Sequence, residues 1–65
     1  MAKEGDRVEL IFTADPFTRL QRGDLGTVAL VDSLGTVHVN WDSGSALGLI
    51  AGEDHYRIVE PKEEP

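Results

Sequence analysis

The sequence contains no cysteine among its 65 residues. This absence excludes disulfide bonds, thiolate metal ligands and cysteine nucleophiles. Basic side chains are also scarce, because 6 Lys and Arg stand against 12 Asp and Glu and give a formal net charge of −6. Proteins that coat DNA or anionic lipid need clustered basic side chains that displace counterions. The charge balance therefore argues against both of these functions.

Long apolar runs are missing as well. No stretch approaches the ~18 residues of a membrane span, and the opening Met-Ala-Lys-Glu-Gly-Asp does not follow the pattern of a signal peptide. We therefore expect a cytoplasmic protein with no membrane partner. A chain of this length predicts one small domain with a stability of roughly 3–5 kcal/mol, which leaves little room for a deep catalytic cleft.

Short alternations of apolar and polar residues fill the chain instead. Val8 and Leu10 alternate with polar residues, and so do Val37, Val39 and Trp41, which is the period of a half-buried strand. The pattern predicts five strands, over residues 7–12, 27–31, 36–41, 45–50 and 56–59. The predicted core consists of Val8, Leu10, Val28, Leu30, Val37, Val39, Leu49 and Ile58.

Turn-forming residues separate these strands. Residues 32–35 and 42–44 predict tight turns in which Gly35 and Gly44 adopt a positive φ angle. Residues 51–54 predict one short helical turn, and 13–23 predict a long first loop. We expect a flexible start over residues 1–4, a folded unit over 5–59 and a flexible acidic tail over 60–65.

An all-β chain with five short strands has no helix to cover one face of a flat sheet. Closing the sheet on itself solves this problem, so we predict a small five-stranded SH3-like barrel. A small oligonucleotide-binding (OB) barrel is the alternative. That fold often places a helix between its third and fourth strands, and there is no room for one between Trp41 and Ser45.

Four segments resemble one family of small bacterial and mobile-element domains that has only been described as a domain of unknown function. They are GDRVEL at 5–10, DPFTRL at 15–20, GDLGTV at 23–28 and VHVNWDSGSALGL at 37–49. The resemblance extends over about Gly5 to Ile58. It implies an SH3-like fold and no assigned activity.

The long loop is the strongest candidate for a functional segment, because long ordered loops on small domains often carry function. It contains Phe17, Arg19, Leu20 and Arg22. One interpretation is a binding surface, in which the arginines donate hydrogen bonds and Phe17 offers a stacking face. The alternative is that Phe17 and Leu20 close the end of the barrel while the arginines pair with Glu9 or Asp24.

Two further aromatic residues, Trp41 and Tyr56, are candidates for the same surface. Aromatic side chains line the peptide groove of SH3 domains, although Trp41 also fits a core position in its alternating strand. His38 and His55 lie in no spacing that suggests a catalytic triad or a metal site. We therefore expect no enzyme activity, no metal and no cofactor.

Three functions remain open. The leading hypothesis is a protein-interaction module, monomeric or weakly dimeric, that binds an unidentified protein through the long loop. Its predicted contact residues are Phe17, Arg19, Leu20, Arg22, Trp41 and Tyr56. The second is a nucleic-acid binder that uses Arg19, Arg22 and Arg7 on phosphates and an aromatic ring on a base. The third, a small-ligand site, is disfavoured because it requires a large concave pocket.

Overall fold

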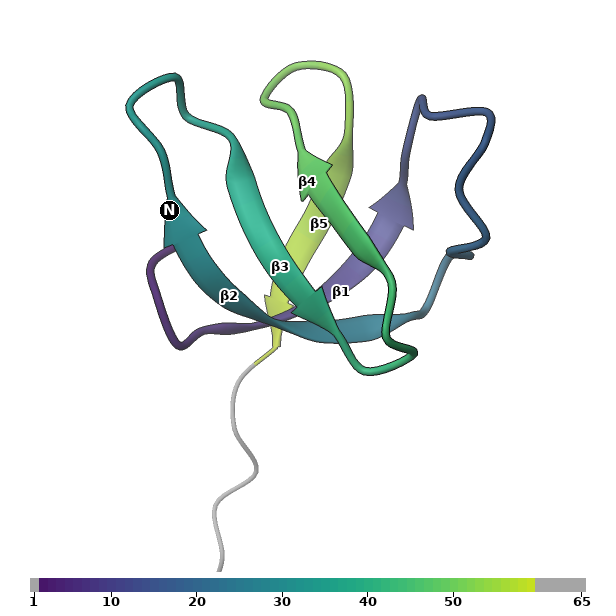
Figure 1. Ribbon diagram of the computed structural model, residues 1–65, viewed down its shortest axis with the longest axis horizontal. Coiled ribbons are helices and arrows are strands. Elements are labelled where there is room, and N and C mark those ends of the chain that lie inside the picture. Colours follow the sequence, from purple (N-terminus) through teal and green to yellow (C-terminus); the bar gives the residue numbers. More distant parts are fainter. Residues whose placement is uncertain (1, 60–65) are drawn as a thin grey trace, which may run out of the picture.

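The computed structural model describes residues 2–59, and Figure 1 shows their arrangement. The chain forms β1 (Arg7–Phe12), β2 (Leu25–Val31), β3 (Val37–Trp41), β4 (Ala46–Leu49) and β5 (His55–Val59). These strands make one antiparallel sheet in the order β4-β3-β2-β1-β5. The described part of the chain contains no helix. The prediction of an all-β fold with five strands is confirmed.

The sheet bends around a single core. Inward-facing residues of β1, β2, β3 and β4 meet in one buried cluster, and Tyr56 of β5 packs against it. The buried members are Ala2, Val8, Leu10, Leu20, Val28, Val37, Val39, Trp41 and Leu49. Ala2 is buried and the Lys3 amide donates to Asp6 at 3.0 Å, so these two residues of the predicted flexible start contact the folded unit. The predicted tail lies outside the described residues.

Two predicted core residues are on the surface. Leu30 is 49% exposed because the β2–β3 register shifts between Val28 and Leu30, which turns Leu30 to the outer face opposite His38. Ile58 lies opposite Val8 but is 37% exposed, because β5 is an edge strand with no neighbour beyond it. The prediction was wrong for these two residues and correct for the other six.

The connections follow the local chemistry of their residues. Gly35 and Gly44 have φ angles of 87° and 92°, as predicted for the two tight turns. The segment predicted as one short helical turn forms a single isolated turn, in which the amides of Glu53 and Asp54 donate to the Ile50 carbonyl at 3.1 and 2.9 Å, and it does not continue into a helix. The long loop occupies residues 13–24, between β1 and β2.

Candidate functional site

The long loop is held firmly at both of its ends. At its start, the buried Asp54 carboxylate accepts hydrogen bonds from the Thr13 hydroxyl at 2.9 Å and from the Ala14 amide at 2.8 Å. The same carboxylate accepts the Ile50 amide at 2.8 Å, so one side chain joins the loop to the β4–β5 connection. At its end, the Gly23 amide donates to the Leu10 carbonyl at 2.8 Å. The loop therefore leaves and rejoins the sheet at fixed points.

Side chains also fix the shape of the loop between these points. The Asp15 carboxylate accepts the Phe17 amide at 2.9 Å, and the Asp24 carboxylate accepts the Gln21 amide at 2.9 Å. Local bonds of this kind stabilise turns that no strand or helix supports. Leu20, only 6% exposed, anchors the middle of the loop in the core. The result is a loop with a preformed conformation.

Phe17 points away from the molecule. Its side chain is 90% exposed, and the neighbouring Arg19 and Arg22 are exposed too. Three of the predicted contact residues are thus exposed on the long loop. The alternative interpretation is correct for Leu20, which closes the core, and wrong for Phe17.

The other two predicted contact residues lie elsewhere. Trp41 is 4% exposed, and its indole Nε1 donates to the Leu47 carbonyl at 3.0 Å, so it is a core residue. Tyr56 is half-buried on β5 and packs against the core. The side chains of Trp41 and Leu20 are therefore not on the surface, and the exposed candidates are Phe17, Arg19 and Arg22 of the long loop.

The arginines of the long loop differ from the other basic residues. Lys3, Arg7 and Arg57 pair with Asp6, Asp42 and Glu9 respectively. Within residues 2–59, neither Arg19 nor Arg22 forms an ion pair. The pairing with Glu9 or Asp24 that the alternative interpretation proposed does not occur: Glu9 accepts the Arg57 Nε, and the Asp24 carboxylate accepts the Gln21 amide. The long loop therefore carries, after Phe17, two arginines that have no ion-pair partner within residues 2–59.

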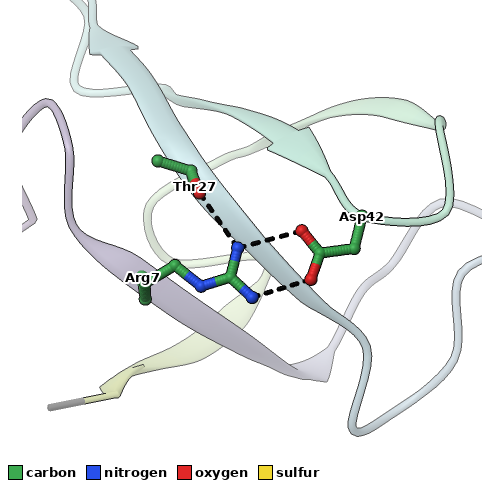
Figure 2. Close-up of polar contacts among 3 residues, drawn as sticks. All are labelled: Arg7, Thr27 and Asp42. Carbon is green, nitrogen blue, oxygen red and sulfur yellow. Dashed lines mark hydrogen bonds and ion pairs between the residues drawn. The ribbon is translucent and has the colours of Figure 1, made fainter. Parts of the chain in front are cut away.

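Arg7 has a structural role instead, which Figure 2 shows. Its Nη1 and Nη2 donate to the two carboxylate oxygens of Asp42 at 2.9 and 2.7 Å. Nη1 also donates to the Thr27 hydroxyl at 2.9 Å, so the cluster joins β1, β2 and the β3–β4 turn. The hydrogen bond raises the pKa of Arg7 and lowers the pKa of Asp42. Arg7 therefore holds three segments of the fold together, and its contact with phosphate stays a prediction.

The carboxylates of two side-chain pairs, Arg7 with Asp42 and His38 with Asp32, make the stability of the fold depend on pH. The bond from Arg7 lowers the pKa of Asp42 from 3.8, and the bond from His38 does the same for Asp32. A carboxyl whose pKa is lower in the folded state stabilises it above the unfolded pKa, and this contribution is lost as the pH falls through the folded pKa. We therefore expect the midpoint of urea unfolding to move to lower urea concentrations as the pH is lowered from about 5 to about 2. A midpoint that stays constant over this range would contradict the ion pairs.

Sequence reasoning missed the role of Asp54. Its contacts to Thr13 and Ala14 span 41 and 40 residues, and no spacing rule connects them. Burial raises the pKa of Asp54, but the hydrogen bonds from Ile50, Ala14 and Thr13 together lower it further, so the net pKa lies below its ordinary value. The only signal in the sequence was an acidic residue beside the Ala51–Gly52 turn.

Comparisons with known proteins place the chain in a family. Residues 2–59 include no helix that is long and apolar enough to cross a membrane. No curated protein and no solved structure matched the chain. One family model matched residues 2–59, and its description is "Domain of unknown function (DUF4314)". Since this match covers nearly the whole sequence, the chain belongs to the DUF4314 family.

Proposed function

We propose that the chain is a non-enzymatic protein-interaction module whose long loop binds a partner protein. The observation that supports this most is Phe17, a ring that is 90% exposed on a loop fixed at both ends. A preformed loop loses little conformational entropy on binding, which favours affinity. Aromatic and Arg side chains are also enriched among the residues that dominate the binding energy of interfaces.

The chemistry of the loop defines what the partner must offer. Phe17 requires an apolar pocket on the partner, and burying such a side chain contributes about 1.5–3 kcal/mol to the free energy of binding. Arg19 and Arg22 are exposed and lack ion-pair partners within residues 2–59, so carboxylates of the partner around that apolar pocket would complement them.

We further propose that the fold is of the SH3-like barrel type, supported by the strand order β4-β3-β2-β1-β5 and the long first loop. A bacterial or mobile-element origin and a cytoplasmic location stay predictions.

The double substitution Phe17→Ala with Arg19→Ala tests this function. We expect it to weaken binding of the partner, captured from cells of the source organism, by about a hundredfold or more, since each residue of this kind contributes about 2 kcal/mol at an interface. The melting temperature should hardly change, because both side chains are exposed.

Leu34→Ala is the matched control. Leu34 is 87% exposed, so the substitution removes a similar apolar surface, but it lies on the β2–β3 connection. It should leave partner binding within about threefold of the wild type. If the double variant binds as tightly as this control, the long loop is not the binding surface.

Nucleic-acid binding is the second candidate, favoured by an exposed aromatic ring and two exposed arginines on one loop, neither of which forms an ion pair within residues 2–59. Two phosphate contacts would give a slope of only about −1.4 for the logarithm of affinity against the logarithm of salt on single strands. Amide-resolved NMR titration with mixed oligonucleotides at low salt separates the two functions. The protein-binding proposal predicts no shifts, whereas shifts over residues 13–23 that salt reverses would support nucleic-acid binding.

A further inference from the structure

The two edges of the sheet differ in their protection. β5 carries the exposed His55 and Arg57 at one edge, whereas β4, Ala46–Leu49, contains no charged residue and no proline at the other. Natural sheets usually protect an exposed edge with charges, proline or a covering segment. β4 has neither a charged residue nor a proline to protect its edge.

The backbone of β4 is also open on one side. Within residues 2–59, its backbone hydrogen bonds join it to β3 alone, apart from the Trp41 indole that donates to the Leu47 carbonyl. In an antiparallel pair, every second residue directs its N–H and C=O away from the neighbouring strand. Apart from the Leu47 carbonyl, which the Trp41 indole already engages, the outer side of β4 therefore presents backbone donors and acceptors that an added strand would satisfy.

Two hollows lie beside this strand and have Leu47 and Gly48 in common. The first measures about 210 Å³ and lies between β4, the start of the long loop and the β4–β5 connection. The second measures about 230 Å³ and lies over β2, β3 and β4, where His38 and Asn40 contribute polar groups. Successive side chains of a strand point to opposite sides. A strand added at this edge would therefore direct alternate side chains toward the two hollows.

The first hollow has a definite chemical preference. Asp15, Glu53 and Asp54 line it, and no Lys or Arg does. Within residues 2–59, none of these three carboxylates forms an ion pair. Leu47 and Ile50 supply apolar surface beside them, which suits the methylene stem of a long cationic side chain. The hollow complements Lys or Arg by both charge and shape.

We propose that the free edge of β4 binds an extended segment of a partner protein as an additional strand, with a Lys or Arg side chain of that segment in the hollow beside Asp15 and Glu53. Main-chain hydrogen bonds supply affinity in this mode, and the side-chain hollows supply specificity. The inference rests on the proposed function only in taking the ligand to be a protein. Its surface does not include Phe17 or Arg19.

The test uses a capped synthetic peptide, acetyl-Thr-Val-Thr-Lys-Thr-Val-Thr-amide, as the probe. Its alternation favours an extended strand, and its Lys has the charge that the hollow complements. Added to ¹⁵N-labelled protein, it should shift the amides of 46–49 and of Glu53 and slow hydrogen exchange along β4. A version with Glu in place of Lys should bind at least about fivefold more weakly, as should a version with N-methyl groups that remove backbone donors.

Glu53→Lys provides the matching change in the protein. It should weaken binding of the Lys peptide by about fivefold, whereas Glu4→Lys, which reverses another exposed charge outside the hollow, should leave it unchanged. Three results would overturn the proposal: equal binding of the Lys and Glu peptides, shifts confined to 17–22, or a β4 edge already occupied by a second copy, which sedimentation would reveal. Partner binding by the double variant Phe17→Ala with Arg19→Ala is measured in a separate experiment. Failure of the proposal for β4 therefore does not contradict the function proposed for the long loop.

Discussion

Gly26→Ala is expected to remove most of the stability of the fold. Gly26 lies in β2, between Val8 of β1 and Trp41 of β3. A Cβ atom at this position would lie 2.9 Å from the Asn40 carbonyl oxygen and 3.0 Å from the Trp41 Cα. Both of these atoms belong to the backbone of β3, so no side-chain rotation relieves the contact. Overpacking costs about 1–3 kcal/mol, which approaches the roughly 3–5 kcal/mol available to a domain of this size.

Urea unfolding followed by Trp41 fluorescence measures the effect, because the chain has a single Trp and it is buried. Gly48→Ala is the control, since Gly48 also lies within a strand and outside the positive-φ region. A Cβ there would meet only side-chain atoms, with the Thr36 Cγ2 at 3.1 Å. We expect a loss of about 3 kcal/mol for Gly26→Ala and less than about 1 kcal/mol for Gly48→Ala. Equal losses would contradict the close approach of β2 and β3.

Asp54→Ala is expected to have an effect of similar size for a different reason. The substitution leaves the Ala14 and Ile50 amides and the Thr13 hydroxyl without their acceptor. A buried polar group that loses its partner costs about 1–3 kcal/mol, so we expect a total of about 3 kcal/mol. Asp54→Asn keeps a carbonyl acceptor and should cost less.

The effect should also be local. Hydrogen exchange at Ala14 and Ile50 should accelerate more than exchange in β2 and β3, because the start of the long loop and the β4–β5 connection lose their common anchor. Asp15→Ala is the control: its carboxylate is exposed and, among the described residues, accepts only the Phe17 amide, so the loss should be about 1 kcal/mol or less. If both substitutions cost the same, Asp54 does not anchor the loop.

The sequence predicted the strands and the tight turns because both depend on neighbouring residues. The alternation of Val37, Val39 and Trp41 predicts a strand whatever surrounds it. Gly35 and Gly44 have positive φ angles, which residues with a side chain rarely adopt, so a glycine in the sequence indicates where such a turn lies. The predicted strands therefore agree with β1–β5 to within a few residues.

Features that depend on distant contacts could not be predicted. The bulge beside Leu30 appears only when β2 is aligned with β3, and it reverses the face of every residue after it. Phe17 and Leu20 are both large and apolar, yet one is 90% and the other 6% exposed. Their directions follow from the path of the loop, which Asp54 fixes from the far end of the chain. The sequence therefore could not divide the candidate residues of the loop between surface and core, and their contact with a partner stays a prediction.

The proposed function requires that the long loop already has its binding conformation before it meets a protein partner. An amide-resolved NMR titration of the ¹⁵N-labelled chain, with the partner protein captured from cells of the source organism, tests this requirement. We expect the largest shifts at 14–23, around Phe17. The amides of Ala14 and Phe17, which Asp54 and Asp15 accept in the free protein, should already be protected from hydrogen exchange before the partner is added. Large shifts that leave 14–23 unchanged, or a loop whose amides exchange freely before the partner is added, would contradict the proposed function.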